Sequence, residues 1–245
     1  VTGNLKMQNN AIGIILGNGW YNQRDRTVEG HMWYDVPKMI LQLEIEYEDG
    51  AKEMIVSDNS WKTTTGPLLH DAIFTGEIYD ARKDLGRWNR ESYDDNIWES
   101  ALQVRPPTGT LMFQTIPFNK VMQIVDTHFE QLNDSLYIFT LPETVSGWCT
   151  LNVEGNSGDM IRLRFISEEG LDYGQTDTYI LKGGDKEEWE PKFTWHTFRK
   201  VEVVSRNTKI SESSLIVKSI FTDVKNTGSF ECSNELFNRI CQAYN

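Results

Sequence analysis

The sequence predicts an all-β protein made of two tandem antiparallel β-sandwiches, with helix confined to its C-terminal end. Three observations lead to this prediction. Short apolar segments recur along the 245 residues and are separated by turn sequences rich in Gly, Asp and Pro. Bulky aromatic residues, which favour strands, are frequent, with 8 Trp, 9 Tyr and 11 Phe. Helical periodicity occurs only near the end of the chain.

The charge and hydrophobic content of the chain indicate which kinds of partner it can bind. The chain has 36 acidic and 24 basic side chains and a formal net charge of −12. This balance argues against nucleic acid and anionic membranes as partners, because both require a basic surface. With 39% hydrophobic residues the chain is a folded protein, and no run of about 18 apolar residues predicts a membrane-spanning helix. Aromatic residues at this density suit a β-sandwich core or a surface that stacks on sugar rings.

The first half of the chain contains three strand signals. The apolar run 11–16 predicts a buried strand. Residues 41–56 alternate apolar and polar side chains around Asp49-Gly50, which predicts a hairpin with one solvated, acidic face. The turn sequence 63–67 precedes another predicted strand at 72–79, and residues 93–98 predict a loop or a one-turn helix.

The second half predicts a further set of strands. In chain order these are 136–139, 148–153, 161–165, 198–203 and 215–221. In the second of them, Trp148 and Thr150 share one face, while Cys149 and Leu151 share the other. The C-terminal helix would begin after an N-cap at Ser233 and would carry one apolar stripe, formed by Leu236, Phe237, Ile240, Cys241 and Tyr244.

No motif in the sequence identifies an active site. The three Cys and four His have no metal-ligand spacing, and the segment 17–19 (Gly-Asn-Gly) predicts a tight turn and not a dinucleotide site. Hydrolysis of a glycosidic bond needs two carboxylates at a defined separation, which sequence cannot supply. Candidates are Asp71, Glu77, Asp80, Asp94, Asp95, Glu168, Glu169, Asp172 and Asp177. On a chain this acidic most carboxylates are solvated, so no catalytic residue is assigned.

Several uncommon residue types occur in a characteristic order through nearly the whole chain. In the first half these are 10–21, Trp61, Gly66-Pro67, 75–82, Trp88, Asp94-Asp95 and Trp98. In the second half they are Gly147-Trp148, Glu188-Trp189, Pro191, Phe193-Thr194, His196, Phe198-Arg199 and 228–234. Taken together, these segments closely resemble the N-terminal region of bacterial α-L-rhamnosidases, a family of glycoside hydrolases.

The resemblance implies a domain arrangement. Residues 1–104 would form a truncated, jelly-roll β-sandwich of the galactose-binding-like type, and 105–123 an extended linker. Residues 124–224 would form the second β-sandwich. Residues 225–245 would form a linker and the first helix of a catalytic α/α barrel, the rest of which this sequence does not contain. The abrupt ends of the sequence agree with a fragment of a longer protein.

The resemblance also implies a division of labour. The parent enzyme would hydrolyse terminal α-L-rhamnose with inversion, using an acid and a base located in the barrel. We therefore expect this chain to have no hydrolase activity alone, and to contribute sugar recognition or to brace the barrel. Its expected partners are rhamnose-containing carbohydrate and the barrel. The family suggests a periplasmic or secreted location, although no signal peptide is evident in the sequence.

Five residues are candidates for carbohydrate contact: Trp20, Tyr21, Glu77, Asp80 and Arg82. Aromatic faces stack on the C–H groups of sugars, and charged side chains bind hydroxyl groups. Glu77 and Asp80 could instead hold calcium, or one of them could pair with Arg82 and stabilise the strand end, which we favour. The alternative for the whole chain is a structural interaction module with no affinity for carbohydrate.

Overall fold

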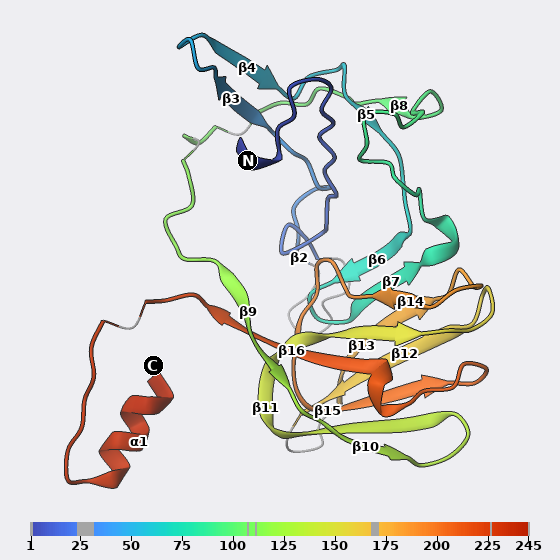
Figure 1. Cartoon of the computed structure of the whole chain (residues 1–245), viewed down its shortest axis with the longest axis vertical. Helices are drawn as coiled ribbons and strands as arrows, with labels where there is room; N and C mark the ends of the chain where they lie inside the picture. The colour runs from blue at the N-terminus through green and yellow to red at the C-terminus, as the bar shows by residue number, and fades with distance from the viewer. Residues whose placement is uncertain are drawn as a thin grey trace.

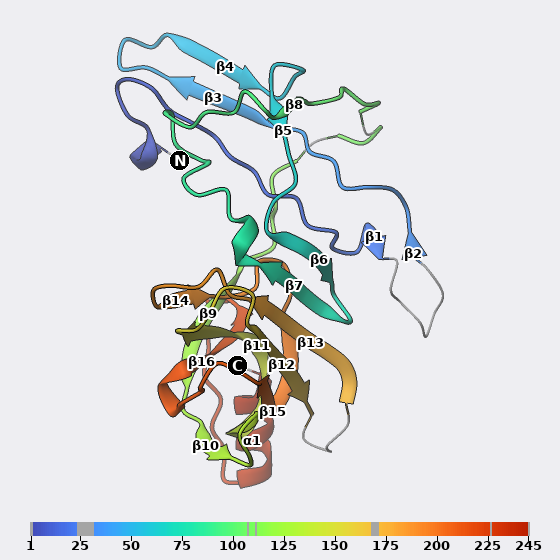
Figure 2. The ribbon, with the colours of Figure 1, turned by 90° about the vertical axis from the view of Figure 1, so that its right-hand side faces the viewer.

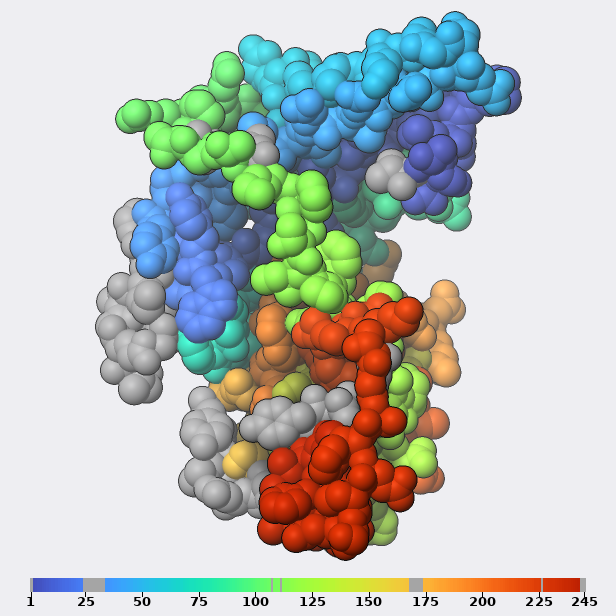
Figure 3. Space-filling model, turned by 90° about the vertical axis from the view of Figure 1, so that its left-hand side faces the viewer, coloured from blue at the N-terminus to red at the C-terminus, as the bar shows by residue number. Residues whose placement is uncertain are grey.

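The computed structural model describes residues 2–23, 32–106, 108–110, 112–167, 172–225 and 227–244. In Figure 1 the N-terminal segments occupy the upper part of the molecule and a curled β-structure the lower part, and Figure 2 gives the same division from the side. Helix α1 (Glu235–Tyr244) lies beside the lower part, where Figure 3 shows it in red. Among the described residues, no helix is long and apolar enough to cross a bilayer.

Sixteen strands are present in the described residues. Those of the first half are short: β1 (Asn22–Gln23), β2 (Met32–Trp33), β3 (Gln42–Glu46), β4 (Lys52–Val56), β5 (Lys62–Thr63), β6 (Leu68–Ala72), β7 (Gly76–Asp80) and β8 (Glu99–Ser100). Those of the second half are β9 (Asn119–Val125), β10 (His128–Gln131), β11 (Leu136–Val153), β12 (Met160–Ile166), β13 (Asp172–Ile180), β14 (Glu187–Trp189), β15 (His196–Ser205) and β16 (Leu215–Thr222). Single 3-10 turns occur at Thr2–Asn4, Ala81–Lys83 and Glu212–Ser214.

Ten of these strands form one sheet, in the order β6-β7-β13-β12-β15-β11-β16-β9, with β10 and β14 paired to β11. Strand β11 pairs with four others and shifts register between Thr140 and Val145. Such an irregularity bends a strand, so the sheet curls and encloses a core between its inner faces. The all-β, sandwich-like fold class is confirmed.

The hydrophobic core lies almost wholly in the second half of the chain. Its largest fully buried side chains include Phe139, Phe165 and Phe198, which come from three different strands. Cys149 and Leu151 of β11 have no exposed surface. On the opposite face of β11, the Trp148 indole N–H donates to Glu190, which confirms the two faces predicted for this strand.

Most strand predictions for the second half are confirmed, with two differences. The predicted strands 136–139 and 148–153 are the two ends of the single strand β11. At the C-terminal helix, the Leu236 N–H donates to Asn234 Oδ1 at 3.0 Å, and the Asn238 N–H donates to the Asn234 carbonyl. Asn234 is therefore the N-cap, and the prediction of Ser233 was wrong by one residue.

In the first half the hairpin prediction is confirmed. Strands β3 and β4 pair in the register Leu43↔Ile55, and Gly50 takes a φ of 82° in the connecting turn. The predicted single strand at 72–79 is wrong, because a turn after Ala72 divides the region into β6 and β7. Residues 93–98 form a loop with a turn and no helix.

The prediction of a buried strand at 11–16 was wrong. The segment forms no ladder with any described strand, and its apolar side chains are exposed, with Ile12 at 42% and Ile15 at 50%. An apolar run indicates a tendency to be buried but supplies no partner for burial. Among residues 2–23 and 34–67, only Gln23 is buried, so this region has little core of its own.

The two halves of the chain meet through β7. It pairs in parallel with β13, in the register Ile78↔Thr178 and Tyr79↔Tyr179, while every other pairing among the described strands is antiparallel. The hairpin β6–β7 therefore extends the sheet of the second half, although the predicted boundary assigns it to 1–104. Strand β9 begins inside the predicted linker 105–123. The domain boundaries themselves stay a prediction.

Candidate functional site

Four aromatic side chains gather where the chain folds back after the N-terminal segment. Trp20 meets Phe74 edge to face, with ring centroids 5.3 Å apart, and Tyr21 stacks on Tyr34 at 5.9 Å. Trp20, Tyr21 and Tyr34 are exposed by 54%, 47% and 64%, respectively. We call Trp20, Tyr21, Tyr34 and Phe74 the aromatic ledge. The large exposed area of its rings makes it available to a ligand.

Backbone geometry around Asn18 holds the ledge in place. The Asn18 N–H donates to Asp71 Oδ1 at 2.7 Å, and the Asn18 amide donates to the Asp71 carbonyl at 2.9 Å. Gly19 has a φ of 49°, which L-residues with a side chain rarely adopt. The chain turns at residues 19–21, where the Asn22 N–H donates to the Asn18 carbonyl at 3.1 Å, so the tight turn predicted at 17–19 lies two residues further along, and Trp20 and Tyr21 are part of it.

Charged groups border the ledge. Lys38 Nζ lies 5.8 Å from the centroid of the Tyr21 ring and also pairs with Asp35. The bond from Lys38 keeps the pKa of Asp35 below its usual value. Aromatic faces beside a cation and a carboxylate provide the two kinds of contact that a sugar ring uses, apolar stacking and hydrogen bonding to hydroxyl groups.

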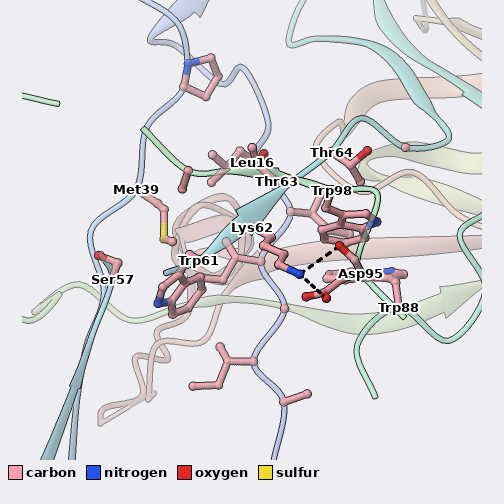
Figure 4. Close-up of a pocket in the computed structure, with 18 of the residues that line it drawn as sticks. Leu16, Met39, Ser57, Trp61, Lys62, Thr63, Thr64, Trp88, Asp95 and Trp98 are labelled. Atoms are coloured by element: carbon pink, nitrogen blue, oxygen red, sulfur yellow. Dashed lines mark hydrogen bonds and ion pairs between the residues drawn. The ribbon is translucent and has the colours of Figure 1, made fainter. Parts of the chain in front are cut away.

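The ledge adjoins a large trough in the N-terminal half, lined partly by Trp61, Trp88 and Trp98 (Figure 4). Lys62 and Asp95 form an ion pair at 2.6 Å on its wall. The trough encloses about 2610 Å³, whereas pockets for small ligands measure about 300–1,000 Å³. Its size matches a loosely filled domain interior better than a ligand pocket, so the ledge is the stronger candidate site.

Glu77, by contrast, has no exposed surface. Its Oε2 accepts the backbone N–H groups of Lys192 and Phe193 at 2.8 and 3.2 Å. Burial raises its pKa to about 7, although the two amide donors act in the opposite direction. The carboxyl group connects β7 to the loop after β14 and presents no atom to solvent, so a sugar cannot reach it in this conformation.

Beside Glu77 lies a second buried polar group. Asp177 Oδ1 accepts the Glu77 N–H at 2.9 Å and the Thr194 hydroxyl at 3.2 Å, and lies 3.1 Å from His196 Nε2. The His196 ring stacks on Phe165 at 4.1 Å. Asp177 and His196 are both enclosed, so this arrangement is a packed polar contact and not an accessible acid–base pair.

Asp80 and Arg82 form the ion pair that we favoured. Arg82 donates through Nε and Nη2 to the two oxygens of Asp80, both at 2.8 Å, and the Arg82 backbone N–H bonds to the same carboxylate. The hydrogen bonds from the Arg82 side chain lower the pKa of Asp80. Asp80 thereby caps the 3-10 turn Ala81–Lys83. Arg82 itself remains half exposed.

The five candidate residues therefore fall into separate places. Trp20 and Tyr21 belong to the ledge, Glu77 is buried, and Asp80 and Arg82 bond to each other at the far end of β7. Glu77 and Asp80 use their oxygens on different partners, and in the described part of the chain no group of three or more His, Cys, Asp or Glu side chains could hold a metal ion. Calcium binding by Glu77 and Asp80 stays a prediction.

The other candidate carboxylates are also accounted for in part. Asp94 accepts the Asn96 N–H, Asp95 pairs with Lys62, and Asp71 holds Asn18. Glu168 and Glu169 lie outside the described residues. Sequence reasoning missed Tyr34 and Phe74 as members of the ledge, and Lys38 as its neighbour, because no local pattern brings these residues together.

Comparison with known proteins agrees with this architecture. The α-L-rhamnosidase N-terminal domain matches residues 1–123, and the bacterial α-L-rhamnosidase concanavalin-like domain matches residues 130–221. An α-L-rhamnosidase of Formosa agariphila is 33% identical over 98% of this chain and 27% of its own length. One of Streptomyces avermitilis is 29% identical over 98% of this chain and 24% of its own length.

Solved structures similar to this chain are also α-L-rhamnosidases. The α-L-rhamnosidase from Dictyoglumus thermophilum superposes with a TM-score of 0.76 and 37% identity, covering 84% of this chain and 25% of that one. The Streptomyces avermitilis enzyme, in complex with L-rhamnose, gives a TM-score of 0.77 and 29% identity over 91% of this chain and 23% of that one.

The chain spans about a quarter of the length of the curated relatives that it matches. The matched segments of this chain are the N-terminal and concanavalin-like domains of α-L-rhamnosidases. The chain belongs to the bacterial α-L-rhamnosidase family.

Proposed function

We propose that this chain is an accessory part of an α-L-rhamnosidase, and that its aromatic ledge recognises rhamnose-containing carbohydrate. The supporting observation is the ledge itself: two aromatic pairs in which Trp20, Tyr21 and Tyr34 are exposed, held by the bonds between Asn18 and Asp71 and bordered by Lys38 and Asp35. L-Rhamnose is a 6-deoxy sugar whose methyl group adds to its apolar surface, so it suits a platform of exposed rings.

The test is a titration of the whole chain with L-rhamnose, with and without calcium, in which binding is measured by calorimetry or NMR. We expect saturable binding that Trp20→Ala or Tyr21→Ala weakens about five-fold or more, because each removes a stacking face worth about 1 kcal/mol or more. Trp195→Ala is the matched control, since Trp195 is also about half exposed (48%) but lies outside the ledge. Wild-type protein that gives no response at millimolar sugar would contradict the proposal.

The parent enzyme would release terminal α-L-rhamnose from glycosides, and this chain alone would not. Support comes from the site: Asp71, Glu77 and Asp177, the carboxylates that the structure brings together, are buried and accept hydrogen bonds from backbone and side-chain donors. We expect no release from an aryl rhamnoside by the purified chain. Activity that is abolished by changing a single carboxylate of this chain would overturn that expectation.

A second role, bracing another domain, is favoured by helix α1. Leu236, Phe237 and Ile240 are exposed by 60%, 54% and 47%, respectively, and share its apolar stripe. A binding assay with a separately produced catalytic domain of a family member tests this role. Loss of association in Phe237→Glu, with no response to sugar in the wild type, would favour the structural alternative over sugar recognition.

A further inference from the structure

Three buried carboxylates lie in a row across three neighbouring strands. Asp71 of β6 is the direct cross-strand partner of Glu77 of β7. The parallel register of β7 with β13, which pairs Ile78 with Thr178, places Asp177 next to Glu77 on the other side. Residues opposite one another in a sheet share a face, so the three carboxylates lie side by side. We call Asp71, Glu77 and Asp177 the carboxylate row.

The row joins the two halves of the chain. Glu77 and Asp71 belong to the hairpin β6–β7, and Asp177 belongs to the second sandwich. The Glu77 N–H donates to Asp177 across 100 positions of sequence, and Glu77 accepts N–H groups of Lys192 and Phe193 from 115 and 116 positions away. The Thr176 N–H adds a bond to the Thr75 carbonyl at 2.9 Å. The row is thus the centre of the seam between hairpin and sandwich.

The charges of the row are poorly compensated. Asp71, Glu77 and Asp177 are exposed by 6%, 0% and 0%, respectively. In the described part of the chain, the hydrogen bonds to their oxygens come from backbone amides, a hydroxyl group and the His196 ring, and none comes from a Lys or Arg side chain. Glu77 Oε1 and Asp177 Oδ2 are buried and have no partner.

Like charges that face each other in a sheet destabilise it, and a buried ionised carboxylate without a cation is costly. A proton relieves both effects. A proton on Glu77 Oε1 neutralises the carboxylate in the middle of the row, and Glu77 Oε2 can still accept the two backbone N–H groups. The raised pKa of Glu77, to about 7, has the same causes: burial first, with the charges of Asp177 and Asp71 adding to it.

We propose that the carboxylate row is a proton-dependent clasp between hairpin β6–β7 and the second sandwich, which is tight while Glu77 carries a proton and loosens when that proton is lost. The sign follows from linkage. A carboxyl group whose pKa is higher in the folded chain than in the unfolded chain stabilises the fold below the unfolded value. That stabilisation is lost as pH rises through the pKa of the folded chain, which is about 7 for Glu77.

Other titratable groups face the row and need to be separated from Glu77. Strand β6 contributes Asp71 and its neighbour His70, and burial raises the pKa of Asp71 as well. Strand β15 contributes His196. Strand β11 contributes the buried thiol of Cys149, whose pKa is raised by burial and by the charge of Asp177. Tyr79 follows on β7 itself. A comparison of wild type with Glu77→Gln isolates the central group, because the amide is the same size and its oxygen can still accept the N–H groups of the loop.

Hydrogen exchange of the full chain tests the clasp. The probes are the amides of Glu77, Lys192 and Phe193, followed at pH 5.5 and 8.5 and corrected for intrinsic exchange. In the wild type we expect the opening constant to rise about ten- to thirty-fold between these pH values, as a shift of pKa from 4.5 to about 7 implies. In Glu77→Gln the same constant should change less than about three-fold. Glu46→Gln, on the exposed face of β3, should behave as wild type.

An equal pH response in wild type and Glu77→Gln would overturn the proposal. Should that variant fail to fold, carboxyl-labelled glutamate in the wild type decides instead. One glutamate carbon that titrates near pH 7 and loses this midpoint in the unfolded chain supports the clasp, whereas titration of every glutamate below about pH 5.5 refutes it. Asp71→Asn, which removes one flanking charge, should lower the midpoint. None of these readouts depends on sugar binding.

Discussion

The two halves of this chain have similar lengths and similar strand signals, yet they differ in burial. From Asn119 to Thr222 the strands enclose phenylalanine, leucine and valine side chains with almost no exposed area. In residues 2–23 and 34–67 only Gln23 is buried, and apolar side chains such as Ile15 line an open trough. Strand pairing alone therefore does not make a core; a second layer that covers the apolar face is needed.

The sharpest test of this contrast is a pair of truncations in the two regions. Phe198→Ala removes a ring with no exposed surface and should cost about 3–5 kcal/mol in the free energy of unfolding. Ile15→Ala, at a half-exposed position of the trough, should cost less than about 1 kcal/mol. Urea denaturation measures both. Equal losses at the two sites would show that the first half is as well packed as the second.

The seam between the halves gives the next largest effect. A Cβ at Gly76 would lie 2.2 Å from the Thr176 carbonyl oxygen, and Gly76 has a φ of 103°. Gly76→Ala should therefore cost about 2–4 kcal/mol, since strain and a backbone clash add. Gly50→Ala, with a φ of 82° and open space around it, is the matched control and should cost about 1 kcal/mol. Comparable losses in the two variants would exclude a tight contact between β7 and β13.

The smallest effect is expected at the end of the seam. Asp80→Ala removes a cap and should cost about 1–2 kcal/mol, whereas Arg82→Ala, whose guanidinium group is half exposed, should cost less than about 1 kcal/mol. Hydrogen bonds from Arg82 lower the pKa of Asp80 in the folded chain. The contribution of Asp80 to the free energy of unfolding is therefore present above pH 3.8, its ordinary pKa, and is lost as pH falls through the lowered pKa of the folded chain. The Asp80→Ala deficit, measured by urea denaturation at pH 7 and pH 3, should therefore shrink in acid. A constant deficit would contradict the assignment.

Local patterns predicted some elements better than others. The hairpin β3–β4 was predictable because alternation and an Asp-Gly turn lie within one stretch of sequence. The division of 72–79 into two strands was not, because Gly76 takes its positive φ where β7 approaches β13, and that contact spans about a hundred residues. The strand predicted at 11–16 failed for the same reason: whether an apolar run is covered depends on distant residues.

The candidate site followed the same rule. Trp20 and Tyr21 were recognisable from sequence as aromatic neighbours after a Gly-containing turn, and the structure adds Tyr34 and Phe74 from other segments. Glu77 was predicted from sequence to bind a sugar hydroxyl or calcium, or to pair with Arg82. Its carboxyl group instead accepts two loop amides, and only the three-dimensional pairing of β7 with β13 makes this visible.

The separation of β7 from β13 along the chain has a consequence during synthesis. Because Glu77 and Asp177 are 100 positions apart, a ribosome that adds about 5–20 residues per second completes the hairpin β6–β7 roughly 5–20 s before its partner strand. For that time β7 has an unpaired edge, the kind of surface that promotes aggregation. While the hairpin is solvated at neutral pH, Asp71 and Glu77 are ionised and repel other chains. The same carboxylates that destabilise the seam when they are buried and ionised thus hinder aggregation at the β7 edge before β13 has been synthesised.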